Sequence, residues 1–208
     1  MELQYFGANS IKVTTKKSVI SIDPESDIAS LKSDLKKTNT VLATQPVFAK
    51  SAGKELFVVT SPGEYEFEDC SVKGIAAQPH TGTTGDVSAT IYRLTVADTT
   101  VLFVGHIDSK LSEEQLEEIG MVDILVVPVG GSGYTLDALG AASVVRAIEP
   151  KVVVPVHSAD DGLDYSVPQA ELELFIKELG APVSEETSEK YKVKLIPEQL
   201  TVQKITRS

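Results

Sequence analysis

The sequence has little of three things that mark common protein classes: cysteine, long apolar runs and positive charge. One cysteine, Cys70, occurs in 208 residues, which excludes an intramolecular disulfide framework and any zinc motif built from several cysteines. No run approaches the roughly 20 apolar residues that a membrane-spanning helix needs, and the first residues show no basic leader pattern. We therefore expect a cytoplasmic protein with no membrane partner.

The shortage of positive charge bears on possible partners. The chain carries 19 Lys and Arg against 30 Asp and Glu, a formal net charge of −11. Nucleic-acid binding gains much of its affinity when Lys and Arg release counterions, so we expect no nucleic-acid partner. A small-molecule ligand remains open, as does the oligomeric state. The length suits one hydrophobic core, and we predict a single domain over residues 1–208.

The first half of the chain consists mainly of short runs with the alternation or apolar content of β-strands. The expected strands span residues 3–6, 11–13, 19–22, 40–44, 55–60, 70–78, 88–96 and 100–104. Pro24 ends the third of these, because proline cannot extend a hydrogen-bonded ladder. A short helix is expected at residues 28–36.

From Ser112 onward, helices alternate with strands. Gln115 follows Ser112 at the spacing of a capping box, which predicts that a helix begins there. Further helices are expected at residues 136–148 and 168–179, and strands at residues 124–128, 152–156, 192–196 and 201–205. A β-rich half followed by alternating strands and helices predicts an α/β protein in which two mixed sheets pack together with helices outside.

Four segments in this order point to a known family. They are Tyr5-Phe6-Gly7 leading to Ile22-Asp23-Pro24, residues 40–44, Pro62-Gly63-Glu64-Tyr65 running to His80, and residues 126–131. The most specific pieces are Val127-Pro128-Val129-Gly130-Gly131 and Val154-Pro155-Val156-His157. With these motifs the chain resembles the metallo-β-lactamase-fold metal-dependent hydrolases, in the branch of β-lactamase superfamily domain proteins. The resemblance runs from residue 3 to about residue 180 and implies a four-layer αββα sandwich of two mixed β-sheets with outer helices.

The resemblance also implies a metal site, from which this chain departs. After the strand that ends in Thr44, the family has two histidines, an aspartate and a further histidine. The residues at those four positions here are not the usual ligands of zinc or iron: Gln45, Val47, Ala49 and Lys50. We therefore expect a divergent family member with a degenerate metal site that is weakly active or inactive as a hydrolase.

Three ligand positions retain imidazoles, which leaves a one-metal alternative. His80 and His157 match family histidines, and His106 stands where the family has a bridging aspartate. These three could hold a single divalent metal, zinc being the best candidate, with water in the fourth position. The reaction would then be hydrolysis of an ester, amide or phosphoester.

Candidate catalytic residues accompany that alternative. Asp108 could orient a histidine or act as a base, and Tyr134 or Lys50 could stabilise developing negative charge. In a metal-free alternative, Lys50 would instead pair with Asp108 or Asp23 at the old metal position. The chain would then be a non-catalytic binding or assembly module.

The remaining polar motifs carry weaker signals. His157 and Ser158, with Asp160 or Asp161, do not suit a catalytic triad, because adjacent side chains on a strand end point to opposite faces. Ser132, Tyr134 and Thr135 follow a glycine-rich turn and could contact a ligand. We interpret the polar loop at residues 81–85 as a long connection rather than a lid.

Overall fold

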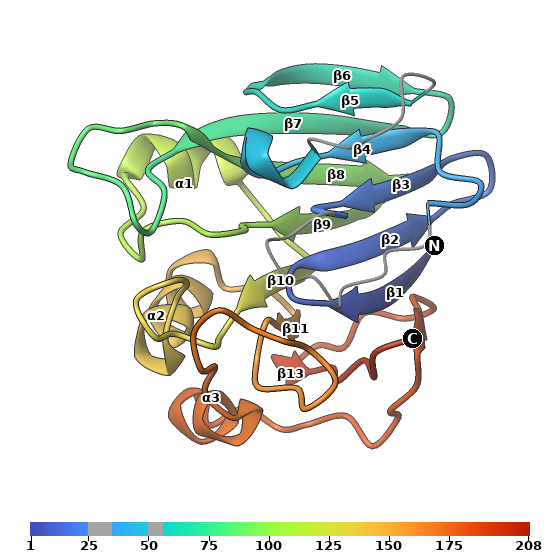
Figure 1. Cartoon of the computed structure of the whole chain (residues 1–208). Helices are drawn as coiled ribbons and strands as arrows, with labels where there is room; N and C mark the ends of the chain where they lie inside the picture. The colour runs from blue at the N-terminus through green and yellow to red at the C-terminus, as the bar shows by residue number, and fades with distance from the viewer. Residues whose placement is uncertain (25–34, 50–55) are drawn as a thin grey trace.

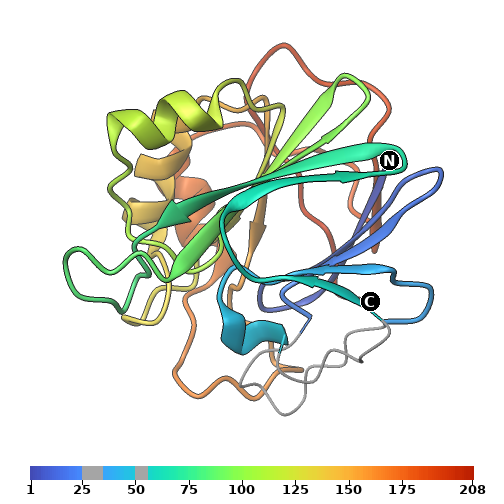
Figure 2. The same ribbon diagram turned by 90° about the horizontal axis from the view of Figure 1, so that it is seen from above.

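The computed structural model describes residues 1–24, 35–49 and 56–208. Two mixed β-sheets face each other, with helices packed outside one of them (Figures 1 and 2). This confirms the predicted α/β class with two mixed sheets.

The six-stranded sheet has the order β12-β1-β2-β3-β4-β5. Its strands are β12 (Lys190–Lys192), β1 (Glu2–Gly7), β2 (Ser10–Thr14), β3 (Val19–Ile22), β4 (Thr40–Leu42) and β5 (Phe57–Val59). β12, β1, β2 and β3 pair antiparallel, whereas β3, β4 and β5 pair parallel. The sheet is therefore a meander extended by two parallel strands.

The seven-stranded sheet has the order β13-β11-β10-β9-β8-β7-β6. Its strands are β13 (Thr201–Val202), β11 (Val152–Val156), β10 (Ile124–Pro128), β9 (Thr99–Phe103), β8 (Ala89–Val96), β7 (Cys70–Ala77) and β6 (Gly63–Phe67). β9, β10, β11 and β13 are parallel. The carboxyl ends of these strands consequently meet at one edge of the sheet.

The two faces of the seven-stranded sheet bury different sets of residues. One face, with Phe103, Val126 and Val154, packs against Ile11 and Ile22 of the other sheet. The opposite face packs against the helices, which contribute mainly small and branched residues. The helices are α1 (Glu113–Ile119), α2 (Ala138–Ile148) and α3 (Leu172–Leu179).

The predicted start of α1 is confirmed by its cap. The Ser112 side chain accepts a hydrogen bond from the Gln115 backbone, and the Gln115 side chain accepts one from the Ser112 backbone. Asp137 caps α2 in a similar way through the Gly140 N–H, so α2 begins slightly later than expected. None of the described helices is long and apolar enough to cross a membrane.

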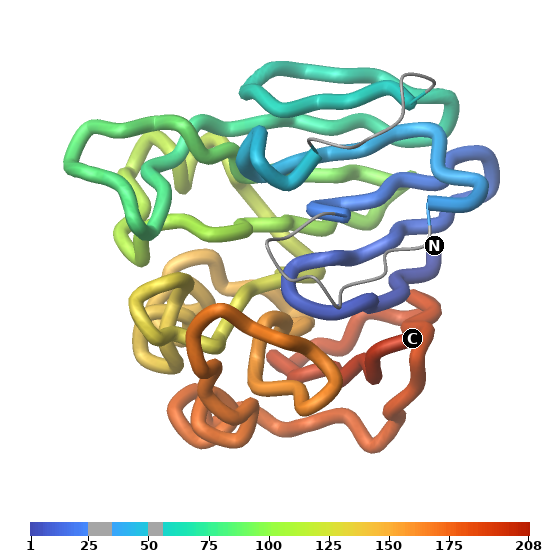
Figure 3. The backbone as a smooth tube through the Cα atoms, in the orientation of Figure 1, coloured from blue at the N-terminus to red at the C-terminus, as the bar shows by residue number. Residues whose placement is uncertain are grey.

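The C-terminal residues lie beside β1, the first strand of the chain (Figure 3). Arg207 forms a parallel bridge to Tyr5, and the Ser208 N–H donates to the Tyr5 carbonyl at 2.9 Å. The last residues thus contact β1 on the same side as β12, one residue further along the strand.

Three differences between the expected elements and the structure have a clear physical cause. β6 was not expected, because Pro62 and Gly63 signal a turn and its outward positions are glutamates. The strand expected at residues 192–196 ends at Lys192, because its partner β1 begins at Glu2 and only Met1 remains to accept the Val193 N–H.

The third difference is the late start of α3, which begins at Leu172 rather than at residue 168. Ala170 is held extended by backbone hydrogen bonds to Gly130 and Ala159, which prevents a helical start. The helix expected at residues 28–36 falls mostly outside the described residues. A helix layer over the six-stranded sheet therefore stays a prediction.

Candidate functional site

The residues singled out by the sequence lie where several strands end. His80 follows β7, His106 follows β9, and His157 comes directly after β11. Loops at the carboxyl ends of parallel strands are the usual place for ligand sites in open α/β sheets. His80 and His106 are neighbours, because the His80 N–H donates to the His106 carbonyl at 2.9 Å.

His106 is placed by a close backbone approach. Gly105 has φ +62°, and a Cβ there would overlap the Thr44 side chain. The His106 side chain is 4% exposed. Its Nδ1 lies 3.1 Å from the amide nitrogen of Asn9, and the Phe48 ring lies 5.0 Å from its ring, centroid to centroid.

His157 is fully buried and has an unusual backbone. Its φ is +56°, a conformation that costs a non-glycine residue on the order of 1–3 kcal/mol. Its N–H donates to the Tyr5 hydroxyl at 3.3 Å, and its Nδ1 lies 3.1 Å from Oε1 of Gln169. Gln169 is oriented in turn because its amide nitrogen donates to the Val167 carbonyl at 2.9 Å.

Aromatic rings enclose the two imidazoles. The His106 and His157 rings stand nearly perpendicular, with centroids 5.0 Å apart. The Tyr134 ring lies 5.0 Å from His106 and 5.7 Å from His157, and the Tyr165 ring lies 5.1 Å from His157. We call His106, His157, Phe48, Tyr134 and Tyr165 the imidazole cluster.

The hydrogen bonds assign opposite tautomers to the two imidazoles. An amide nitrogen can only donate, so Nδ1 of His106 accepts from Asn9 and the ring proton sits on Nε2. An amide oxygen can only accept, so Nδ1 of His157 donates to Gln169 and its Nε2 keeps a lone pair. At Nε2, one ring is therefore a donor and the other an acceptor.

Both imidazoles are neutral near pH 7. Burial lowers the pKa of His106 well below its ordinary value, and the nearby His157 and His80 lower it further. Burial lowers the pKa of His157 to about 4, although the hydrogen bond with Gln169 acts in the opposite direction. The cluster thus carries no positive charge under ordinary conditions.

Asn9, which contacts His106, also forms a side-chain hydrogen bond with Asp23. The Asp23 carboxylate accepts hydrogen bonds from the Thr44 N–H at 2.7 Å and the Thr44 hydroxyl at 2.6 Å. Burial raises the Asp23 pKa to about 7, against the lowering effect of the hydrogen bonds with Thr44 and Asn9. Asn9 therefore links a titratable carboxyl to the His106 ring.

The positions of the lost ligands hold groups that pack or bond locally. Phe48, in the 3₁₀ helix Pro46–Ala49, turns its ring onto His106. The Gln45 amide is 3.4 Å from the His106 carbonyl, and Val47 and Ala49 are half-buried. Lys50 lies outside the described residues, as does any ion pair it makes.

The other candidate residues are not drawn to the imidazoles. The Asp108 carboxylate accepts a hydrogen bond from the Lys110 N–H at 2.8 Å. The Asp160 carboxylate binds the Arg207 guanidinium through two contacts, at 2.6 and 3.1 Å, so it does not serve His157 and Ser158. Of the two catalytic candidates that the structure describes, Asp108 and Tyr134, it is Tyr134 that contacts the rings.

The turn after β10 is organised around its glycines and polar residues. Ser132 donates a hydrogen bond to the Pro168 carbonyl, and Thr135 is fully buried with no partner for its hydroxyl among the described atoms. The loop at residues 81–85 is tied down through the Gly82 N–H to Pro79 and the Gly85 N–H to Gln78.

Sequence reasoning missed the groups that set the tautomers. Asn9 lies in the β1–β2 turn and Gln169 precedes α3, and neither belongs to a motif. Asn9 is 97 residues from His106 along the chain, so only the fold brings them together. One indication in the sequence that Phe48 belongs to the site was its place between two of the replaced ligand positions, Val47 and Ala49.

The donor set does not fit the two metals that the fold family implies. Among the described residues, no three His, Cys, Asp or Glu side chains are grouped so that they could hold a metal ion. The opposite tautomers point the same way, because a metal-binding nitrogen needs a lone pair and Nε2 of His106 carries a proton. A metal role for His80, His106 and His157 stays a prediction.

Comparison with solved structures shows the fold. A proposed Zn-dependent hydrolase of the metallo-β-lactamase superfamily from Thermotoga maritima has a TM-score of 0.77 at 20% identity, covering 99% of this chain and 98% of its own. Igni18, a metallo hydrolase from Ignicoccus hospitalis, has a TM-score of 0.61 at 18% identity, covering 86% and 90%. An isothiocyanate hydrolase from Delia radicum gut bacteria has a TM-score of 0.62 at 13% identity, covering 86% and 93%.

Comparison at the level of sequence gives the family. No curated protein matches the chain. The model of the β-lactamase superfamily domain matches residues 2–157, which is most of the chain. The match covers every described strand except β12 and β13, together with the three histidines and the replaced ligand positions. This protein therefore belongs to the β-lactamase superfamily domain family.

Proposed function

We propose that this chain is a non-catalytic binding or assembly module, in which the family's metal site has become a packed cluster of imidazole and aromatic rings. The observation that carries the proposal is that a buried amide lies against each Nδ1, the nitrogen of Asn9 at His106 and the oxygen of Gln169 at His157, each at 3.1 Å, from which we infer opposite tautomers. Nε2 of His106 then carries the proton and Nε2 of His157 the lone pair, whereas two imidazoles that share a metal must both offer lone pairs.

The surroundings of the rings support the same proposal. Hydrolysis by metal-bound water needs an open coordination position that substrate can reach, and His106 and His157 are 4% and 0% exposed. Phe48 is 3% exposed and lies against His106 in the loop where the family has ligands. We propose that the protein acts in the cytoplasm and has no nucleic-acid partner.

The test is the metal content of untagged protein, measured by plasma mass spectrometry after loading with zinc, iron and manganese. A His106→Ala variant is treated in parallel. We expect substoichiometric metal that is the same in both proteins, and equal background hydrolysis of p-nitrophenyl acetate and bis(p-nitrophenyl) phosphate. Near-stoichiometric metal that His106→Ala abolishes would overturn the proposal.

A second candidate function is one-metal hydrolysis at His80, His106 and His157. One observation favours it: Nδ1 of His80 and Nε2 of both other rings are buried without a hydrogen-bond partner among the described atoms. For His106 to bind through Nε2, Asn9 would have to present its oxygen to Nδ1–H. Asn9→Asp, which offers only acceptors when ionised, should then increase zinc retention; under the metal-free proposal it should not.

A further inference from the structure

A second region of the molecule forms a solvent-accessible cleft, whereas the imidazole cluster is buried. At one end of the sandwich, the two sheets finish in β5 and β6, which are joined by residues 60–62 (Figure 1). Between these strands lies a cleft of about 530 Å³, within the range of ligand-binding clefts. None of the residues that line this cleft stands at one of the family's metal-ligand positions.

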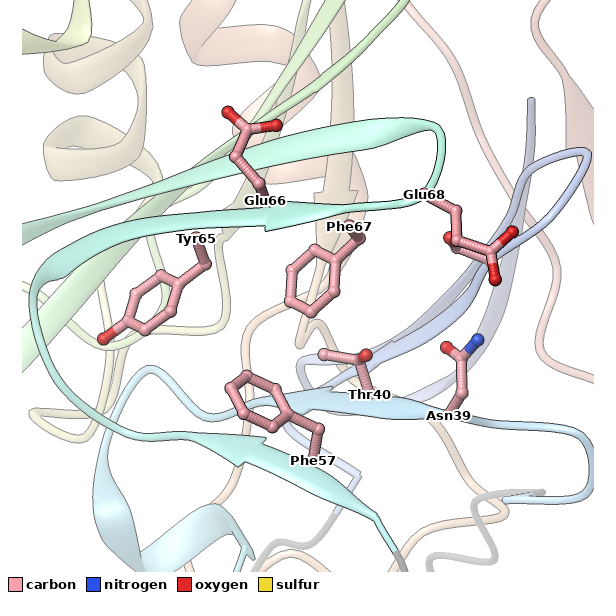
Figure 4. A pocket seen from close by; sticks show the side chains of 8 residues that line it. Asn39, Thr40, Phe57, Tyr65, Glu66, Phe67 and Glu68 are labelled. Atoms are coloured by element: carbon pink, nitrogen blue, oxygen red, sulfur yellow. The ribbon is translucent and has the colours of Figure 1, made fainter.

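The cleft has aromatic walls. Phe57 of β5 and Phe67 of β6 both line it and pack edge to face, with ring centroids 5.8 Å apart at an angle of 74° (Figure 4). Tyr65 also lines the cleft, and its hydroxyl donates to the Ser61 carbonyl at 3.1 Å, which holds its ring in place. Phe57 is nevertheless 55% exposed, so a large apolar surface faces water here.

β6 ends its sheet. It pairs with β7 on one side, and no strand pairs with its other edge among residues 1–24, 35–49 and 56–208. An edge strand of this kind presents backbone N–H and C=O groups that can pair with an added strand. The edge lies directly beside the cleft.

The side chains of β6 alternate strictly in chemistry. Tyr65 and Phe67 point into the cleft toward Phe57, whereas Glu66 projects from the opposite face of the strand (Figure 4). Glu64 shares that outer face and is likewise exposed. A strand added to β6 would follow the same alternation, since neighbouring residues across a ladder share a face.

We propose that the free edge of β6 and the adjoining cleft bind an extended segment of another protein in which basic residues alternate with apolar ones. The apolar side chains enter the cleft and pack against the rings of Tyr65, Phe67 and Phe57 that line it. The basic side chains lie against Glu64 and Glu66. This names a partner class for the proposed binding module and rests on that function, but it uses a different part of the molecule.

Charge favours a basic partner over a second copy of this chain. The turn from β6 to β7 adds Glu68 and Asp69 to the two outer glutamates. Lys17 is 3.9 Å from Glu68, with both side chains largely exposed, and Lys73, opposite Glu64, is paired with Glu118 at 3.0 Å. The region stays acidic, and two chains with a net charge of −11 repel each other.

The test measures binding of a fluorescein-labelled peptide, Lys-Val-Lys-Phe-Lys-Val with blocked ends, to the full chain by fluorescence anisotropy. Its controls are the same peptide with Glu for Lys, and a form N-methylated at alternate backbone nitrogens. The protein variants are the double reversal Glu64→Lys with Glu66→Lys, and Phe57→Ser. A matched double reversal, Glu117→Lys with Glu198→Lys, makes the same charge change at exposed sites elsewhere.

We expect the basic peptide to bind and each cleft variant to weaken its Kd by about tenfold or more, with the matched reversal changing it by less than about threefold. The acidic and N-methylated peptides should not bind. Urea unfolding midpoints confirm that the variants are folded, since all the substituted side chains are exposed.

Three results would overturn the inference. Equal binding of the basic and acidic peptides would remove the charge argument, and undiminished binding of the N-methylated peptide would indicate an apolar ligand site without strand pairing. A dimer in size-exclusion chromatography that the Glu64 and Glu66 reversal dissociates would make a second copy the occupant. Each leaves the metal measurements unchanged, so this inference and the proposed function fail separately.

Discussion

The imidazole cluster and the β5–β6 cleft lie at different edges of the same two sheets and have opposite physical character. In the cluster, His106 and His157 are buried, neutral and fixed by amides. In the cleft, Phe57 is more than half exposed, and the acidic side chains of Glu64 and Glu66 lie nearby on β6. In this molecule, the loops where the family has its metal ligands are tightly packed. The surface that we propose for partner binding is the cleft between β5 and β6.

The largest expected difference between the two regions is in packing. Phe48→Ala removes a buried ring from the cluster and should lower the free energy of unfolding by about 3–5 kcal/mol. Phe57→Ala removes an exposed ring from the cleft and should change it by only about 0.5 kcal/mol. Urea unfolding measures both, and equal losses would contradict the contrast.

The next effect is a pH dependence carried by Asp23. Its folded pKa of about 7 lies above the ordinary 3.8, so its contribution to stability is fully present below about pH 4 and is lost as the pH rises through 7. Each pKa unit corresponds to about 1.4 kcal/mol, so Asp23→Asn should gain on the order of 4 kcal/mol relative to the wild type between pH 4 and 8.

The sign is opposite for His157, and this provides a check. Its folded pKa of about 4 lies below the ordinary 6.5, so its contribution is present above pH 6.5 and is lost as the pH falls toward 4. Unfolding free energies at several pH values should therefore fall on the acid side in the Asp23→Asn protein. The exposed Asp161→Asn variant should show the same pH dependence as the wild type. If Asp23→Asn also shows the wild-type pH dependence, Asp23 does not carry the effect.

A smaller effect is expected from the amide that orients His157. Gln169→Met keeps the side-chain length but removes the acceptor for Nδ1–H, which leaves a buried donor unpaired. We expect a loss of about 1–3 kcal/mol, measured by urea unfolding. The same change at the exposed Gln199 is the control, and a similar loss there would show that the hydrogen bond is not responsible.

The smallest effect on stability is expected at the cleft. Reversing Glu64 and Glu66 to Lys should change the free energy of unfolding by no more than about 0.5 kcal/mol, because exposed charges contribute little. A loss comparable to that of Phe48→Ala would indicate that the outer face of β6 is needed for folding rather than free for a partner.

The sequence predicted most of the fold because the relevant signals are local. The apolar strands β10 and β11, each followed by a distinctive turn, and the Ser112 capping box are legible within a few residues. β6 was missed because Pro62 and Gly63 signal a turn and because its outward positions, Glu64 and Glu66, are residues uncommon in strands. The extent of the single domain, residues 1–208, stays a prediction.

The site was predictable only in part. The loop positions of the three histidines and the loss of usual ligands at Gln45, Val47 and Ala49 were visible in the sequence. The tautomers were not, because Asn9 and Gln169 reach the rings through tertiary contacts that no local pattern encodes. The cleft likewise depends on two strands from different sheets.

The most direct test of the account is a long-range ¹H–¹⁵N correlation spectrum of the imidazoles at neutral pH, recorded with and without excess zinc. The account predicts that His106 is protonated at Nε2 and His157 at Nδ1, and that zinc leaves both unchanged. If both rings are protonated at Nδ1 and their Nε2 resonances shift when zinc is added, the cluster binds metal and the central claim is wrong.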